Sequence, residues 1–191
     1  MAAACPNNAK CERITAPGQL AWYAIQIQSR LARVVSTTFR GKGYEELLPL
    51  YRSRRRWSDR VKELELPLFP GYLFCRFNPS DRLMPILATP GVVNIVGAGK
   101  TPIPVDEDEI EAIRAILRSG LRTEPWPLLQ LGSKVRIDAG PLEGFEGIVI
   151  NTDKICRLIV SVGLLQRSVA VEINREWAHP VSARTHPPSR F

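Results

Sequence analysis

Pro67-Leu-Phe-Pro-Gly-Tyr-Leu-Phe-Cys-Arg-Phe77 is the stretch of the 191-residue chain that decides its fold. Proline and glycine mark turns, and aromatic residues are enriched in strands. The stretch therefore predicts a turn over Phe69-Pro-Gly-Tyr72 that leads into a strand. The simplest interpretation is a core strand with a Pro-Gly turn before it. The alternative is a binding site, because two aromatic rings on a rigid turn suit a contact hot spot.

A second motif lies downstream, between Gly132 and Val149. The apolar residues Val135 and Ile137 alternate with polar residues, as in a strand. The residues that follow stand at positions where a small barrel must turn tightly. These turn residues are Gly140, Pro141, Gly144 and Gly147. The short strand-like runs from there to Trp177 predict an all-β unit rather than a further α/β layer.

The two motifs together resemble one protein family. The glycine-rich segment resembles the KOW motif, and Phe69-Pro-Gly-Tyr72 with its strand resembles the core motif of the NusG amino-terminal domain. The resemblance extends over residues 21–178 and implies an α+β chain, with an α/β sandwich of the NusG type before a small all-β, SH3-like KOW barrel. Within the family, Pro67–Phe74 looks closer to the specialised RfaH/UpxY-like antiterminators than to the general factor.

The expected organisation has five segments. Residues 120–130 contain two prolines and no periodicity, which is typical of a stiff linker. The segments are a disordered tail over 1–20, the amino-terminal domain over 21–119, the linker over 120–130, the KOW domain over 131–178 and a second disordered tail over 179–191.

Local patterns predict the elements of the first domain. We expect strands at Trp22–Gln28, Glu46–Leu50 and Gly91–Val96, helices at Leu31–Lys42 and Leu83–Leu87, and a charged hairpin over Tyr51–Leu66. A helix should follow Asp106-Glu-Asp-Glu109, because carboxylates in a first turn complement the helix dipole.

The chain is basic, with 26 Lys and Arg against 19 Asp and Glu and a formal charge of +7. Such a charge favours a polyanionic partner. The candidate contacts to non-template or upstream DNA are Arg30, Arg33, Arg54, Arg55 and Arg56. The alternative for the last three is a solvated hairpin, since arginines also keep strand edges soluble.

Several kinds of chemistry find no support in the sequence. The four cysteines form no CxxC pair and both histidines fall in the expected tail, so we expect no metal, no cofactor and no enzyme. Gly97-Ala-Gly-Lys-Thr101 looks like the end of a phosphate-binding loop, but Asn94 replaces its first glycine and Pro102 follows. A turn between strands is the preferred interpretation. Cys75 and Cys156 are expected to be buried as small hydrophobes.

The resemblance also implies site residues. The first domain would dock on the clamp helices of RNA polymerase through a hydrophobic depression, with Trp22 in the core beside it. The residues of that depression are Tyr23, Phe69, Pro70, Gly71 and Tyr72. In the barrel, Leu164 and Leu165 stand where general members carry an aromatic contact for a small-subunit ribosomal protein or a termination factor.

The sequence thus predicts a monomeric transcription elongation or antitermination factor. It would bind RNA polymerase and suppress pausing or termination, as a specialised member of its family. No run approaches 18 apolar residues and the first 20 residues lack a signal-peptide core, so we expect a cytoplasmic protein. The alternative is a ribosome-associated, RNA-binding KOW protein.

Overall fold

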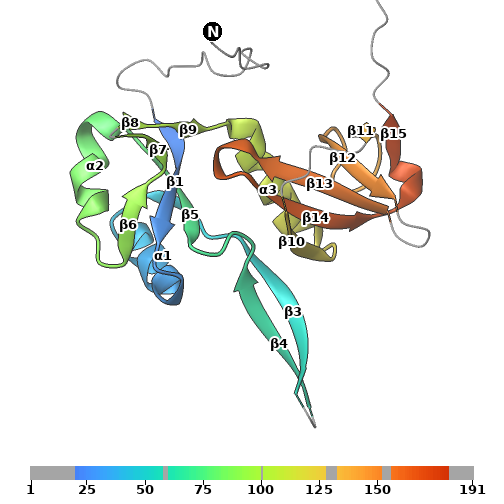
Figure 1. Cartoon of the computed structure of the whole chain (residues 1–191), viewed down its shortest axis with the longest axis horizontal. Coiled ribbons are helices and arrows are strands. Elements are labelled where there is room, and N and C mark those ends of the chain that lie inside the picture. Colours follow the sequence, from blue (N-terminus) through green and yellow to red (C-terminus); the bar gives the residue numbers. More distant parts are fainter. Residues whose placement is uncertain (1–19, 58–59, 100, 128–132, 152–155, 181–191) are drawn as a thin grey trace, which may run out of the picture.

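The computed structural model describes residues 20–57, 60–99, 101–127, 133–151 and 156–180 (Figure 1). The described chain begins with a sheet packed between helices and ends in a strongly curled sheet, here called the barrel. The elements of the first part are β1 (Ala21–Ile27), α1 (Ala32–Gly41), β2 (Glu45–Leu47), β3 (Leu50–Trp57), β4 (Arg60–Pro67), β5 (Tyr72–Phe77), α2 (Pro79–Leu87), β6 (Val92–Ile95), β7 (Gly97–Ala98), β8 (Thr101–Pro102), β9 (Pro104–Val105) and α3 (Glu107–Ser119).

The main sheet has the order β2-β5-β1-β6, with β9 also paired to β1, and its pairs are antiparallel. Side chains alternate between its faces, as the strand repeat of two requires. On one face Trp22 and Phe74 share a core with Ile110 of α3. On the other, Tyr23 and Leu73 share a core with helices α1 and α2, through residues such as Phe39 and Ile86. The expected α/β sandwich is therefore confirmed.

The helices begin at polar caps. The side chain of Asn78 accepts a hydrogen bond from Ser80 N at 3.0 Å, so α2 starts four residues before the expected Leu83. Asp106 caps α3 in the same way, through Asp108 N at 3.2 Å, and the acidic first turn is part of this helix start as expected.

Strands β3 and β4 form the predicted hairpin, which projects away from the body of the molecule (Figure 1). Strands β7 and β8 pair with each other, with Ala98 opposite Thr101. Thr101 is therefore the first residue of a strand and not the start of a helix. This confirms that the segment is a turn between strands.

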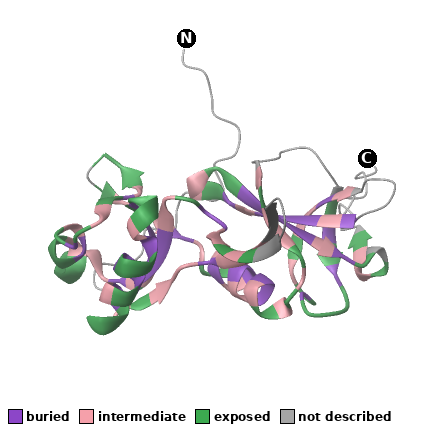
Figure 2. Ribbon diagram, turned by 90° about the horizontal axis from the view of Figure 1, so that it is seen from below, coloured by how far each residue is buried: buried purple, intermediate pink, exposed green. Residues whose placement is uncertain are grey.

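The barrel has the strand order β10-β14-β13-β12-β11-β15. Its elements are β10 (Thr123–Pro127), β11 (Ser133–Ile137), β12 (Glu146–Asn151), β13 (Cys156–Val162), the 3-10 turn η2 (Gly163–Leu165), β14 (Arg167–Ile173) and β15 (Ala178–Pro180). The interior contains mainly branched aliphatic side chains such as Val162, Val169 and Val171. Figure 2 shows buried residues running through both parts of the chain.

The structure differs from the sequence-based prediction at the linker. Residues 123–127 form β10, which pairs with β14 in the register Glu124↔Ala170 and Trp126↔Ser168. Two prolines fit here because β10 is an edge strand. On one side of such a strand the backbone pairs with no other strand, so a missing N–H donor costs no ladder hydrogen bond there. His179, expected in the carboxy-terminal tail, lies on β15 opposite Arg136. The rest of that tail, and the tail before Leu20, lie outside the described residues.

Candidate functional site

The Phe69–Tyr72 segment is a tight turn at the start of β5. Tyr72 N donates to Phe69 O at 3.0 Å, and Gly71 has φ +85°, a left-handed value that suits glycine. Gly71 O accepts from Ile27 N at 2.8 Å, which ties the turn to β1. One hydrogen bond thus closes the turn, and a second bonds it to the neighbouring strand β1.

The aromatic residues of this turn are placed differently. Phe69 is fully buried and packs edge-to-face on Phe74, with ring centroids 5.6 Å apart. Pro70 is exposed, and Gly71 and Tyr72 are half-buried at the surface. Phe69 therefore supports the turn from below, whereas Pro70 and Tyr72 can meet a partner.

Tyr23 does not join this group. It is 3 % exposed and packs on Phe77, with ring centroids 4.6 Å apart, in the core under α1 and α2. Trp22, its neighbour in β1, faces α3 and is buried as predicted. Because adjacent strand residues face opposite sides, Tyr23 and Phe69 are separated by the sheet. The depression expected from the sequence therefore lacks Tyr23.

The sequence analysis did not include Gln26 of β1 among the candidate residues of the docking surface. It is exposed, and it lies directly opposite Tyr72 in the β1–β5 register. The repeat of two counted from Trp22 through Ala24 places Gln26 on the Tyr72 face. That spacing was available in the sequence, but only the register shows that Gln26 reaches the turn.

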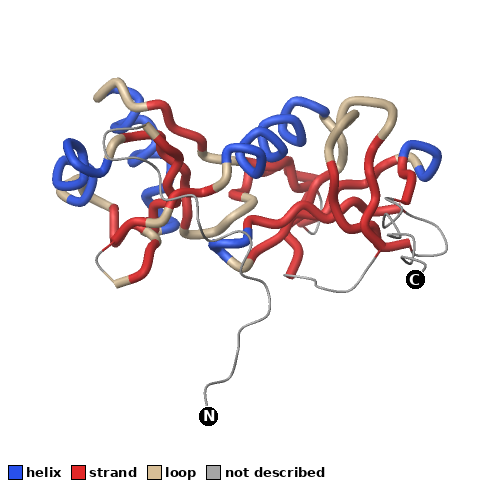
Figure 3. Tube along the Cα trace, turned by 90° about the horizontal axis from the view of Figure 1, so that it is seen from above, coloured by secondary structure: helices blue, strands red, loops and turns tan. Residues whose placement is uncertain are grey.

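The barrel lies against the same face of the sheet. The guanidinium of Arg167 stands 5.6 Å from the centre of the Tyr72 ring, and Gly163 N donates to Glu109 Oε1 of α3 at 3.2 Å. Leu164 and Leu165 are partly buried against a core that contains residues of α3 and of the barrel. Figure 3 shows α3 between the sheet and the barrel. Tyr72, which was predicted to meet polymerase, and Leu164 and Leu165, which were predicted to meet a barrel partner, thus lie around one interface.

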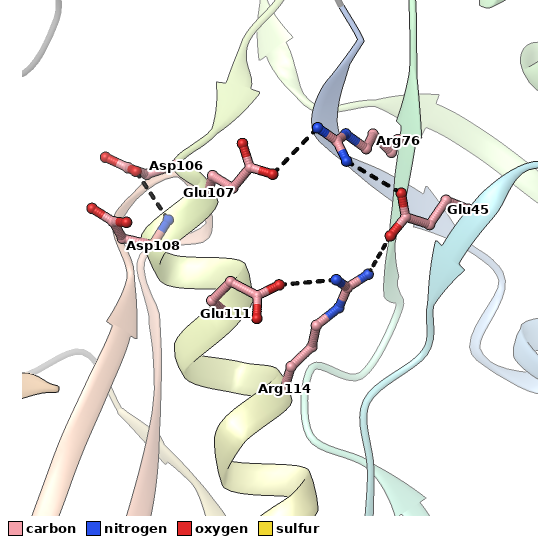
Figure 4. Close-up of polar contacts among 7 residues, drawn as sticks. All are labelled: Glu45, Arg76, Asp106, Glu107, Asp108, Glu111 and Arg114. Atoms are coloured by element: carbon pink, nitrogen blue, oxygen red, sulfur yellow. Dashed lines mark hydrogen bonds and ion pairs between the residues drawn. The ribbon is translucent and has the colours of Figure 1, made fainter. Parts of the chain in front are cut away.

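An ion-pair network holds α3 on the sheet (Figure 4). Arg114 bonds Glu45 at 2.7 Å and Glu111 at 2.9 Å, and it lies 4.8 Å above the Trp22 ring. Arg76 links Glu45, at 3.5 Å, to Glu107 of α3, at 3.3 Å. The hydrogen bond from Arg114 lowers the pKa of Glu45, and the same bond raises the pKa of Arg114. Sequence spacing gave no sign of this network, because it joins three separate elements.

The basic candidates lie on a different surface. Arg30 and Arg33 are exposed at the start of α1, and Arg33 pairs with Glu65 of β4 at 2.9 Å. This hydrogen bond lowers the pKa of Glu65. An open groove of about 580 Å³ lies there, lined by Arg33, Arg52, Glu63, Leu64 and Glu65. Arg54, Arg55 and Arg56 follow along β3, and their side chains lie outside the described residues.

The KOW glycines shape the turn between β11 and β12. Gly140 has φ +85°, and a Cβ there would meet the Trp177 ring at 2.9 Å, so only glycine fits. Pro141 and Gly144 are exposed in the same turn, while Gly147 lies in β12 opposite Val135. These residues build the β11–β12 region of the barrel, and Gly144 also lines a shallow pocket with Arg136 and Glu143.

The described residues contain no metal-binding cluster of three or more His, Cys, Asp or Glu. None of their helices is long and apolar enough to cross a membrane. Cys75 and Cys156 are both buried, as expected, and burial raises the pKa of the Cys75 thiol to about 12. A thiol of this kind is protonated and inert near neutral pH.

The fold defines a two-part binding protein in which a helix–sheet–helix unit precedes a KOW-type barrel. A family model described as "Transcription termination factor nusG" matches residues 20–114. The transcription termination/antitermination protein NusG of Thermus thermophilus is 30% identical over 164 residues, covering 79% of this chain and 82% of the relative. Its counterpart in Escherichia coli K12 is 30% identical over 134 residues (68% and 71%), and that of Buchnera aphidicola 28% over 167 residues (80% and 92%).

A solved structure entitled "Domain interaction in Thermotoga maritima NusG" has the same fold. It matches with a TM-score of 0.55 and 20% identity, covering 86% of this chain and 98% of that one. The chain belongs to the NusG family. It is accordingly a transcription elongation/antitermination factor, and not an enzyme.

Proposed function

We propose that the chain binds RNA polymerase through the surface around Tyr72 and suppresses pausing or termination. One observation carries this proposal: the Tyr72 ring and Pro70 stand on a closed turn whose Phe69 is locked in the core beneath them. A ring held in this way loses little conformational entropy when a partner covers it. Membership of the NusG family supports polymerase as that partner.

The docking surface differs from the one expected from sequence. It consists of Gln26, Pro70, Gly71 and Tyr72, with Phe69 as buried support. The resemblance to NusG proteins supplies the clamp helices of polymerase as the docking element. Holding the clamp to the opposite wall of the main channel would keep polymerase closed and disfavour pausing. This action needs binding energy alone, so the proposal includes no cofactor and no covalent step.

Nucleic-acid contact is proposed for the arginine side of α1. Arg30 and Arg33 are exposed, and Arg33 donates a hydrogen bond to Glu65. Phosphates of the non-template strand or the upstream duplex would neutralise these cations, which gives salt-sensitive affinity. Arg54, Arg55 and Arg56 belong to the same proposal by sequence alone.

The barrel is proposed to bind a small-subunit ribosomal protein or a termination factor through η2. Leu164 and Leu165 offer apolar area there, although they replace the aromatic residue of general members. That replacement, with the Pro67–Phe74 motif, supports a specialised role for this chain, acting as a monomer in the cytoplasm.

The test is single-round transcription by the cognate polymerase on a paused template. Wild type should speed pause escape, and Tyr72→Ala should weaken polymerase binding by about 10-fold or more, as expected for a hot-spot aromatic. Met84→Ala is the matched control, since Met84 is 70 % exposed on α2, on the opposite face of the sheet. Phe69→Ala is a poor probe, because a buried Phe→Ala change costs about 3–5 kcal/mol of stability.

Arg30→Ala and Arg33→Ala in the same assay address the nucleic-acid contact. They should weaken the effect at low salt and lose their influence as salt rises. If Tyr72→Ala binds polymerase as wild type does, the docking assignment is wrong. Binding to ribosomal RNA without any association with polymerase would favour the ribosome-associated alternative.

A further inference from the structure

Strand β4 places a carboxylate beside the arginines of the proposed nucleic-acid surface. Glu65 Oε2 accepts a hydrogen bond from Arg33 Nη2 at 2.9 Å, and the two side chains form an ion pair. In the ladder of the hairpin, Glu65 lies directly opposite Arg52 of β3. Directly opposite residues have their side chains on one face, with Cβ atoms about 5 Å apart. Glu65 is therefore bonded to a guanidinium from α1 and lies next to a second one from β3.

The same arrangement is repeated one step further along the hairpin. Glu63 of β4 lies opposite Arg54 of β3, which is the next pair on that face. The open groove of about 580 Å³ is lined by two arginines and two glutamates, with one leucine: Arg33, Arg52, Glu63, Glu65 and Leu64. The charges that line the groove are therefore balanced, although the whole chain carries a formal charge of +7.

The ion pair between Arg33 and Glu65 lies in solvent. The two side chains are 63% and 50% exposed. Ion pairs as exposed as this one contribute little to stability and open at small cost. The hydrogen bond from Arg33 lowers the pKa of Glu65, and the charge of Arg52 adds to this effect. Near neutral pH the carboxylate is thus ionised and remains an acceptor for Arg33.

Carboxylate and phosphate are alternative acceptors for one guanidinium. The planar N–H donors of arginine match the oxygens of either group, and both give charge-assisted hydrogen bonds. A phosphate that approaches Arg33 meets a cation that Glu65 has already neutralised, and the carboxylate repels it as well. A full contact with phosphate therefore requires that the Arg33–Glu65 pair opens.

We propose that Glu65 acts as an internal substitute for a phosphate: it occupies the Arg33 guanidinium in the free protein and is displaced when a nucleic-acid strand binds there. This inference rests on the proposed nucleic-acid contact of Arg33. It adds that β4 sets the strength of that contact from within the chain.

The displacement has a consequence for specificity. Non-specific binding to nucleic acid is almost entirely electrostatic, so a basic chain binds any exposed strand. A carboxylate that competes with phosphate weakens this binding for every sequence, which is a way of rejecting wrong partners. A strand held next to the groove by a docked polymerase has a high effective concentration and can still displace Glu65.

Affinity for a single strand tests the proposal with the full-length chain. The probe is a labelled oligothymidylate of about 15 nucleotides, which is within the usual site size of single-strand binders. All variants are measured at one low salt concentration, because the affinity depends on salt. Glu65→Gln should bind the probe more tightly than wild type. Both Arg33 and Glu65 are exposed, so their variants should stay folded.

A double-mutant cycle separates competition for Arg33 from simple loss of negative charge. The gain from Glu65→Gln should be larger when Arg33 is present than in an Arg33→Ala background. The ratio of the two gains should be about 1.5- to 5-fold, the change in equilibrium that an exposed ion pair produces. Glu143→Gln is the matched control, because it removes the same charge from an exposed position of the barrel. Its gain should be the same with and without Arg33.

The carboxyl pKa of Glu65, followed by carbon-13 NMR, is a second measurement. Arg33→Ala should raise this pKa, because the main cause of its depression is removed, and the probe should raise it in wild type by taking Arg33 away. Arg52 and Glu63 face the same groove and stay in place in both experiments.

The possible failures differ. Equal gains from Glu65→Gln with and without Arg33 would overturn the proposal and leave the Arg33 contact intact, provided that Arg33→Ala alone weakens binding. A Glu65 pKa that the bound probe does not change would also overturn it. If Arg33→Ala binds the probe as tightly as wild type does, the proposed contact itself is wrong and the role of Glu65 falls with it.

Discussion

The two faces of the main sheet are stabilised by different means. Under α1 and α2 the core is closed by packed rings and aliphatic side chains, with Tyr23 on Phe77 and Phe39 near Tyr44. Ser36 adds one hydrogen bond to Glu46 there. On the other face, α3 shares its core with the barrel and is fixed at its border by the half-exposed network of Glu45, Arg76, Glu107, Glu111 and Arg114.

This difference corresponds to what each face must do. Packed aromatic cores tolerate little displacement, because interiors are close-packed. Exposed ion pairs contribute little each and can exchange partners or water at small cost. Both faces have packed rings, with Phe69 on Phe74 on the Tyr72 face, so the two faces differ at the border, where exposed ion pairs hold α3. The face under α1 and α2 is called the rigid face.

The largest effect is expected on the rigid face. Phe39→Ala should lower the free energy of unfolding by about 3–5 kcal/mol, because Phe39 is fully buried and its removal leaves a cavity. Urea unfolding monitored by circular dichroism measures the loss. A loss below about 1 kcal/mol would show that this face can collapse around the cavity and is not the rigid one.

A smaller effect is expected at the ion-pair network. Arg114→Ala removes two ion pairs and the contact with the Trp22 ring, which together contribute about 1–2 kcal/mol. Arg118→Ala is the matched control on the same helix, since Arg118 is 72 % exposed and reaches Glu111 only at 3.6 Å. The difference between the two variants should shrink in 1 M salt. A salt-independent loss of 3 kcal/mol or more would mean that Arg114 acts as part of the core.

The sequence predicted the fold well because the fold depends on local patterns. The Pro-Gly turn, the repeat of two in β5 and the glycines of the KOW turn each specify their own geometry. The edge strand β10 was missed because Pro125 and Pro127 are typical of linkers as well as of strand edges. Only the pairing with β14, forty or more residues away, distinguishes the two.

The site could be predicted in part. Phe69 to Tyr72 form a turn as expected, but sequence does not show that Phe69 faces inward and Tyr72 outward. To predict where Tyr23 lies, one would have to know which face of β1 packs against α3. The contact of Arg167 with Tyr72 joins two domains, and no local pattern encodes it. Their roles in binding polymerase, DNA or a barrel partner stay predictions.

The smallest effect concerns the protonation of Glu45. Its pKa is lowered, chiefly by the hydrogen bond from Arg114, from an ordinary value of 4.5. A carboxyl with a depressed folded-state pKa adds stability that is fully present above about pH 4.5 and is lost as pH falls through the folded-state value. Since the Glu45 side chain is 46% exposed, solvent screens it, and the contribution should be only a few tenths of a kcal/mol.

Urea unfolding of wild type and Glu45→Gln between pH 7 and pH 3 measures this contribution. The stability difference between them should be constant near neutrality and shrink below about pH 4.5. In an Arg114→Ala background the shrinkage should largely disappear, because the main cause of the shift is gone. If the shrinkage persists there unchanged, Arg76 and not Arg114 is the partner that matters. The α3 face would then be held mainly through β5, and removal of Arg76 should loosen it more than removal of Arg114.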